Sequence, residues 1–223
     1  FRRLFAEGVF NAAFIPSYTE AKLKNKNEGK KFADDILNLL VIVLLGVVFL
    51  VEIFTPTFVY LIAPGFTEET IKFDLAVALT RITFPFLFFV SLSSFFSGIL
   101  NTNNKFAAAA AAPIILNIFL ILSLVISNLL DLNFEINLSY AVSLAGFFQL
   151  IFLIFCTKRY YKPSINFKIK ISTKVKFFLK KLLPSIFSSG VTQINILIGT
   201  IIASFEAGAV SYLYYADRIY QIN

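Results

Sequence analysis

The chain has 223 residues, 58% of them hydrophobic, and a mean hydropathy of +0.80. A soluble domain of this length cannot bury so much apolar surface, so the composition excludes an ordinary water-soluble protein and predicts an all-α bundle of membrane-spanning helices. The net charge is +7, but the cations gather at the ends of apolar runs, which indicates cytoplasmic loops and argues against binding of nucleic acid.

Six apolar segments predict membrane helices, and a seventh begins near the end of the chain. In chain order they are residues 1–21, 36–62, 73–100, 106–130, 138–157, 182–205 and 209–223. The uncharged runs 36–51 and 106–130 are long enough to cross a hydrocarbon core of about 30 Å. Pro85 predicts a kink in the third helix. The chain starts with Phe1 and stops inside an apparent helix, so we expect it to be part of a longer protein.

The connections between these helices alternate in charge. The first, third and fifth connections together hold 15 cations; they are residues 22–35, 101–105 and 158–181. The second, fourth and sixth hold one cation, Lys72, and five acidic residues; they are residues 63–72, 131–137 and 205–208. By the positive-inside rule the first set is cytoplasmic. The unbroken alternation supports the predicted number of helices independently of hydropathy.

The longest connection, residues 158–181, carries nine cations and no acid. Its later part, from Lys174 to Lys181, predicts an amphipathic helix that lies on the bilayer surface. We therefore interpret residues 158–181 as a basic cytoplasmic linker. It separates a first lobe of membrane helices, residues 1–157, from the beginning of a second lobe, residues 182–223.

Four arginines lie inside apolar sequence rather than in a connection: Arg2, Arg3, Arg81 and Arg218. An arginine in a membrane-embedded helix costs about 2.5–3.5 kcal/mol on insertion scales, so it is tolerated mainly where it faces a watery cavity or an anionic partner. The pattern predicts a transporter with a cationic cavity for an anionic substrate. Arg81 has Asp74 seven residues earlier on the same face, which favours snorkelling or a structural ion pair for that arginine.

The segment FRRLFAEG at residues 1–8 is the densest candidate site. Arg3 and Glu7 are four residues apart, so they share a helix face and can pair. Arg2 lies elsewhere on the helix without such a partner, and we expect it to contact substrate. The alternative is an interfacial arginine pair that reaches lipid head groups.

The segment YYADRIY at residues 214–220 is the second candidate site. Arg218 and Tyr214 share a helix face, whereas Asp217 points elsewhere. A guanidinium group beside a phenol suits a phosphate-bearing ligand. A structural link from this Arg–Asp pair to another helix is the alternative.

Uncharged polar residues inside the helices have two interpretations. Gln193 belongs to a polar stripe on the sixth helix, with Asn195 nearby, and Asn117 is alone in an apolar helix. Each can form hydrogen bonds between helices or line a cavity.

Catalytic and metal chemistry find little support in the sequence. With one cysteine, Cys156, and no histidine, the chain cannot form a His/Cys metal site, a Cys–His catalytic pair or an internal disulfide, and we expect no cofactor. No nucleophile elbow or phosphate-binding loop occurs, so we expect a protein that is not an enzyme.

Three stretches carry a specific resemblance: FRRLFAEGVFNAAFIPSYTE, LTRITFPFLFFVSLSSFFSGILNTNNKF and SYLYYADRIYQ. They follow one another in the order and at the spacing of the MurJ/MviN family of lipid II flippases. The similarity covers nearly the whole chain, which resembles the second to seventh helices of that family and the start of the eighth. The family belongs to the multidrug/oligosaccharidyl-lipid/polysaccharide exporter superfamily, so the resemblance implies part of a MATE-like, two-lobed transporter.

The resemblance also implies an activity. Members export lipid II, the undecaprenyl-pyrophosphoryl-linked peptidoglycan precursor, across the bacterial inner membrane by alternating access. Lipid II and membrane lipids are then the expected partners of a monomeric transporter. Arg2 and Arg218 match essential cavity arginines of the family and would hold the pyrophosphate from opposite lobes, and Arg3 and Glu7 match neighbouring motif residues.

One position departs from the family. Some members have a sodium site that uses a side-chain oxygen where this chain has Gly199, and Asn195 alone would replace it poorly. This difference argues against sodium coupling and favours the membrane potential as the driving force.

Two alternatives stay open beside lipid II export. One is a flippase for another polyprenyl-linked glycan. The other is a membrane enzyme acting on polyprenyl phosphates, which would need catalytic carboxylates. Only Glu7 and Asp217 are candidates for that role, and each adjoins an arginine.

Overall fold

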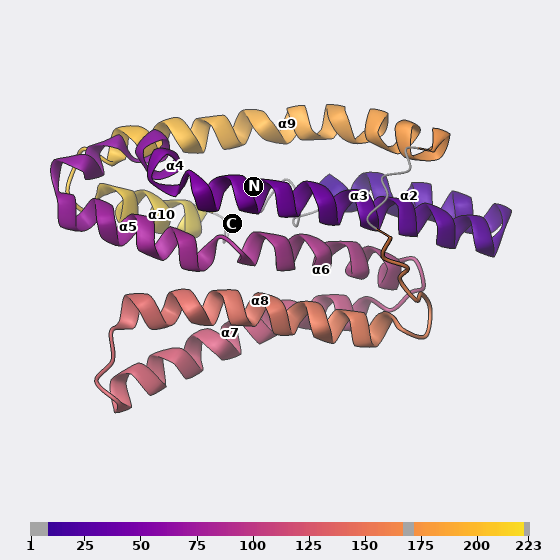
Figure 1. The fold of residues 1–223 in the computed structure, drawn as a ribbon, viewed down its shortest axis with the longest axis horizontal. Coiled ribbons are helices and arrows are strands. Elements are labelled where there is room, and N and C mark those ends of the chain that lie inside the picture. Colours follow the sequence, from indigo (N-terminus) through magenta and orange to yellow (C-terminus); the bar gives the residue numbers. More distant parts are fainter. Residues whose placement is uncertain (1–8, 167–171, 221–223) are drawn as a thin grey trace.

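The computed structural model describes residues 9–166 and 172–220, and all the regular structure in these ranges is helical. The long helices lie roughly side by side in an elongated bundle (Figure 1). Four segments are long and apolar enough to span a membrane: Lys26–Ile53, Thr70–Asn101, Phe106–Leu129 and Phe134–Thr157. These observations confirm the predicted class, an all-α polytopic membrane bundle.

The elements follow the predicted order, with differences at their ends. They are α2 (Val9–Lys24), α3 (Lys26–Ile53), α4 (Thr55–Ile62), the 3-10 helix η1 (Pro64–Glu68), α5 (Thr70–Thr83), α6 (Phe86–Asn101), α7 (Phe106–Leu129), α8 (Phe134–Thr157), α9 (Thr173–Ala203) and α10 (Ala209–Tyr220).

The prediction of a polar loop at residues 22–35 is wrong, because this stretch is almost entirely helical. α2 continues to Lys24 and α3 begins at Lys26, with only Asn25 extended between them. The Asn25 side chain accepts a hydrogen bond from the backbone N–H of Asn27 at 2.9 Å, which caps α3. A Cβ atom on Gly29 would lie 2.9 Å from the Cα atom of Lys22, so glycine is needed where the two helices approach. Charged residues at the ends of membrane helices resemble a loop in hydropathy although they continue the helix.

Proline explains one of the two breaks in the long helices. The predicted kink is confirmed: α5 ends at Thr83, α6 begins at Phe86, and Pro85 lies in the break between them. The second helix breaks at Phe54, which was not predicted, and α4 then starts with a proline in its first turn.

The surface helix expected from Lys174 to Lys181 is instead the first part of α9. This helix runs without interruption from Thr173 to Ala203. Val175 and Phe178 are 1% and 2% exposed, and the Phe178 ring packs edge-on against Phe10 of α2 at 5.8 Å between centroids. Val175 and Phe178 of this segment therefore pack against the protein.

A buried aromatic cluster joins the consecutive helices α2 and α3 to α6 and α9, which are distant from them in sequence. It consists of Phe10 and Phe14 of α2, Phe32 of α3, Phe95 of α6 and Phe178 of α9. Ring centroids in this cluster lie 5.0–6.5 Å apart, a separation at which aromatic pairs add stability beyond the burial of their area. The cluster fixes α9 against the helices that precede it.

The connections of opposite charge lie at opposite ends of the bundle. At one end, on the right in Figure 1, Lys22 Nζ donates to Asn103 Oδ1 at 2.6 Å and Lys174 Nζ bonds Glu28 at 2.6 Å. We call this the basic end. At the other end the backbone N–H of Gly65 donates to Ser204 Oγ at 3.0 Å. The arrangement agrees with the alternation of charge in the sequence.

Candidate functional site

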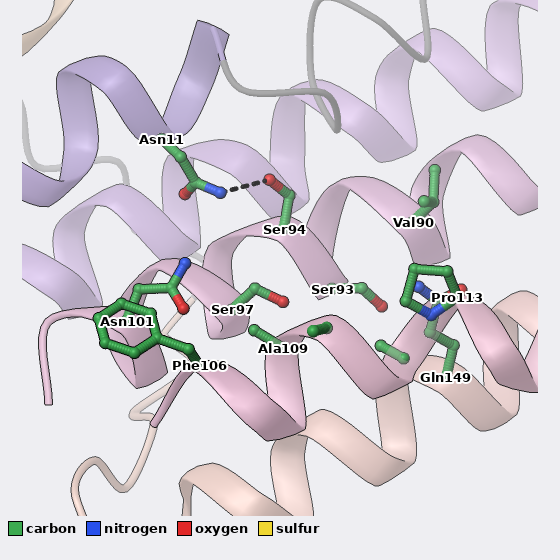
Figure 2. Close-up of a pocket in the computed structure, with 12 residues that line it drawn as sticks. Asn11, Val90, Ser93, Ser94, Ser97, Asn101, Phe106, Ala109, Pro113 and Gln149 are labelled. Carbon is green, nitrogen blue, oxygen red and sulfur yellow. Dashed lines mark hydrogen bonds between the residues drawn. The ribbon is translucent and has the colours of Figure 1, made fainter. Parts of the chain in front are cut away.

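A cavity of about 400 Å³ lies between α2, α6, α7 and α8 (Figure 2). Its volume is in the range of about 300–1,000 Å³ that is common for ligand sites. The polar side chains that line it are Asn11, Ser93, Ser94, Ser97, Asn101 and Gln149. The apolar wall is formed by Val90, Phe106, Ala109, Ala110, Ala112 and Pro113. None of the described lining residues is charged.

The spacing of residues on α6 produces the polar side of this cavity. Ser93, Ser97 and Asn101 recur at intervals of four residues, so they lie on one face of the helix. Gly98 allows α2 to approach α6 beside that face. A Cβ atom on Gly98 would lie 2.6 Å from Asn11 Oδ1 and 2.9 Å from the Phe14 ring.

The polar atoms of the cavity are only partly satisfied by the protein. The Asn11 side-chain amide donates from Nδ2 to Ser94 Oγ at 3.2 Å (Figure 2). The buried Asn11 Oδ1, Asn101 Oδ1 and Ser93 Oγ atoms have no hydrogen-bond partner among the described residues. Because an unsatisfied buried polar atom costs about 1–3 kcal/mol, the cavity favours an occupant that donates hydrogen bonds, such as a hydroxyl or amide group or water.

The chemistry available here is recognition by neutral hydrogen bonds. Ser93 and Gln149 are 2% and 7% exposed, so their polar groups are largely shielded from bulk solvent. Within residues 9–166 and 172–220 no group of three or more Cys, Asp and Glu residues is arranged to hold a metal ion. The described cavity offers no pair of nucleophile and base.

The structure describes only some of the residues that the sequence singled out. Arg2, Arg3 and Glu7 lie outside the described residues. On α10 the Arg218 guanidinium group lies 5.0 Å from the centre of the Tyr214 ring, which confirms that these two share a face.

The other candidates lie apart from the cavity. Asp217 is exposed on α10, and Asn117 is exposed on α7, one turn beyond Pro113 of the cavity wall. Gln193 is half-buried and Asn195 is exposed on α9. Further along α9 a Cβ atom on Gly199 would lie 3.4 Å from the Leu213 side chain, so this glycine faces α10. Roles for these residues stay predictions.

Sequence reasoning missed the cavity residues. Asn11 follows a motif whose arginines were the more obvious candidates. Serine is common in membrane helices, so the serines of α6 gave no specific signal. The four-residue spacing of Ser93, Ser97 and Asn101 was the available signal. The contribution of Gln149 from α8 required the tertiary structure.

Comparison with known proteins adds independent findings. The model of a protein family described as "Lipid II flippase MurJ" matches residues 1–223. The chain belongs to the MurJ family.

Similar members come from several bacteria. The probable lipid II flippase MurJ of Rickettsia prowazekii is 42% identical over 99% of this chain and 43% of the relative. The protein of that name from Rhizobium tropici is 40% identical over 100% of this chain and 43% of the relative. The chain thus spans a little under half the length of these MurJ proteins.

A solved structure shows the same fold. The lipid II flippase MurJ in an inward closed conformation superposes with a TM-score of 0.77 at 30% identity, over 99% of this chain and 45% of that one. The described bundle is therefore the MurJ arrangement of helices, and the chain is a multi-pass membrane protein. Relatives are named as flippases, which are transporters.

Proposed function

We propose that the full-length protein containing this chain is a lipid II flippase of the bacterial inner membrane. The match of the MurJ family model to residues 1–223 carries this proposal. The names of the relatives and the similarity to a solved MurJ structure support it. We further propose that the protein acts as a monomer by alternating access between two lobes.

The proposed substrate carries two kinds of group that need different recognition. Its pyrophosphate is anionic, and Arg2 and Arg218 are the residues proposed to hold it, while Arg3 pairs with Glu7. The contact of Arg218 with Tyr214 supports this role, because it orients a guanidinium group on an exposed helix face. The sugars and peptide carry neutral hydroxyl and amide groups, which suit the uncharged cavity lined by Asn11 and Ser93.

Growth rescue tests the function as a whole. Bacteria depleted of their own lipid II flippase are supplied with the full-length protein, and we expect growth together with lipid II on the outer face of the inner membrane. Rescue of cells that lack a flippase for a different polyprenyl-linked glycan, without rescue of these cells, would support that alternative substrate instead.

Arg218 provides a sharper test of substrate recognition. Arg218→Ala should abolish rescue at normal expression, and Arg218→Lys should restore part of it, because lysine keeps the charge but loses the two-pronged geometry for phosphate. Tyr212→Ala, an exposed change on the same helix, is the control. Full rescue by Arg218→Ala would contradict the proposed contact with pyrophosphate.

A further inference from the structure

A second hollow, of about 380 Å³, lies at the basic end of the bundle. Two distant parts of the chain line it, the α2–α3 junction and the segment that follows α8. Six of its lining residues are cations: Lys22, Lys26, Lys30, Lys158, Arg159 and Lys162. The other described lining residues are Tyr18, Asn27, Tyr160 and Tyr161, so no carboxylate is among them. We call this site the cationic hollow.

The segment that follows α8 is fixed to α3 by partly buried hydrogen bonds. The Tyr161 side chain is 4% exposed, and its hydroxyl donates to Asp34 Oδ1 at 2.5 Å. The backbone N–H of Ser164 donates to the same oxygen at 3.1 Å. Asn38 Nδ2 donates to the Ser164 carbonyl at 3.1 Å, and the Asn166 N–H donates to Asn38 Oδ1 at 2.9 Å.

These hydrogen bonds hold the cations of the hollow in a defined arrangement. Burial, together with Asp34, raises the pKa of Tyr161, so its hydroxyl keeps the proton that it donates. Arg159 and Lys162 are therefore held opposite Lys26 and Lys30, although more than 120 residues separate the two groups in the sequence.

The nearby glutamates bond cations that do not line the hollow. Glu20 pairs with Lys24 at 2.9 Å, and Glu28 pairs with Lys174 at 2.6 Å. Lys22 donates a hydrogen bond to the neutral side-chain amide of Asn103. Because like charges that are brought together repel, this concentration of cations favours an anionic occupant.

The place of the hollow in the bundle identifies the kind of anion. The candidate span that contains α8 ends at Thr157, directly before Lys158, whereas the uncharged run of α3 begins only at Ile36, after its charged first turns. Lys158, Arg159 and Lys162 therefore lie beside the end of an apolar span, where lipid head groups and tyrosines are common. The positive-inside rule places this end at the cytoplasmic leaflet.

We propose that the cationic hollow binds the phosphate of a lipid head group in the cytoplasmic leaflet. Arg159 supplies two parallel donors to phosphate oxygens, and the lysines act as point charges around them. The site is distinct from the cavity between α2, α6, α7 and α8, and its binding of lipid does not depend on which substrate the full-length protein transports. An anionic phospholipid and a polyprenyl diphosphate share the required chemistry.

Two charge-matched variants of the full-length protein test the proposal. Lys26→Gln, Arg159→Gln and Lys162→Gln together remove three cations from the hollow. Lys176→Gln, Lys180→Gln and Lys181→Gln together remove three exposed cations from the start of α9, at the same end but outside the hollow. Each protein is placed in phosphatidylcholine nanodiscs, and its binding of phosphatidylglycerol and of undecaprenyl diphosphate is measured. Size-exclusion profiles and melting temperatures check that both variants are folded.

The hollow variant should bind at least one of these lipids about a hundredfold more weakly than the unmodified protein. Each of the three basic residues that it lacks contributes a similar free energy to the binding of an anionic lipid. The α9 variant should differ by less than threefold. Loss confined to phosphatidylglycerol identifies a phospholipid as the occupant, and loss confined to undecaprenyl diphosphate identifies a polyprenyl lipid.

Equal weakening in both variants would overturn the proposal in favour of general surface charge. Binding of inorganic pyrophosphate as strong as that of either lipid would also overturn it, as would the absence of binding above the phosphatidylcholine background.

Discussion

The cavity between α2, α6, α7 and α8 and the cationic hollow have similar volumes, about 400 and 380 Å³, but opposite chemistry. The first is lined by amides and hydroxyls within the bundle, and the second by six cations at its basic end. The difference agrees with position along the helices: apart from Asn101 at the end of α6, the polar cavity residues lie inside helices, whereas the cations of the hollow lie near helix ends or directly after α8. A charge inside the hydrocarbon region costs several kcal/mol, whereas a neutral amide or hydroxyl there costs less, and cations at the interface are solvated by water and head groups. The two sites also depend on different contacts, which mutations can separate.

The largest effect is expected where α2 approaches α6 beside the cavity. Gly98→Leu places side-chain atoms where a Cβ alone would already lie 2.6 Å from Asn11 Oδ1, so it should destabilise the protein by about 3 kcal/mol. Thermal unfolding in detergent measures this change. Gly46→Leu on α3 is the matched control, because nothing lies within 4 Å of a Cβ at that position. Equal losses in the two variants would contradict close packing at Gly98.

The next effect concerns the segment that lines the cationic hollow. Tyr161→Phe removes the donor to Asp34 and should destabilise the protein by about 2 kcal/mol, since a hydrogen bond to a charged group is lost in a buried place. Binding of lipid phosphate should weaken as well. The separate cavity should be unaffected, so packing around Asn11 should be unchanged. Tyr140→Phe, at an exposed tyrosine of α8 outside the hollow, is the control. Unchanged melting temperature and lipid binding in Tyr161→Phe would show that this hydrogen bond does not organise the hollow.

A smaller effect distinguishes two neighbouring serines of the cavity. Ser94→Ala removes the acceptor of Asn11 and should cost about 1 kcal/mol. Ser93→Ala removes a buried hydroxyl that has no hydrogen-bond partner among the described residues, so stability should be unchanged or slightly higher. If Ser93 contacts a polar part of the substrate, Ser93→Ala should nevertheless reduce growth rescue. Identical losses of stability in the two variants would mean that the hydrogen bond to Asn11 is not what distinguishes them.

The smallest effect is a dependence on pH at the basic end. The hydrogen bond and charge of Lys174 lower the pKa of the exposed Glu28 below its ordinary value of 4.5. Since the folded-state pKa is depressed, the stabilising contribution is present above the unfolded pKa and is lost as the pH falls through the folded value. Lowering the pH below 4.5 should therefore reduce the melting temperature slightly more in the unmodified protein than in Lys174→Gln. The same pH dependence in both proteins would show that this pair contributes nothing measurable.

Hydropathy and charge predicted much of the fold because both act locally. The order of the helices, the kink at Pro85 and the alternation of basic and acidic connections follow from short stretches read one at a time. The motifs around Arg2 and Arg218 also identified the family, since a motif survives in the sequence whatever surrounds it. The pairing of Arg218 with Tyr214 was predicted for the same reason, because residues four apart on a helix always share a face.

Contacts between distant segments were decided only by the tertiary structure. Phe178 has the pattern of a surface helix in the sequence, but the rings of α2 and α3 bury it. A serine in a membrane helix can bond a neighbouring helix or line a cavity, and Ser94 and Ser93 differ in this respect only because Asn11 reaches one of them. Likewise, Tyr161 gains its partner from α3. The sequence by itself determined which apolar segments are helices, where charge can lie and which family the chain resembles. Packing decided which polar groups meet, because that depends on distances between residues far apart along the chain.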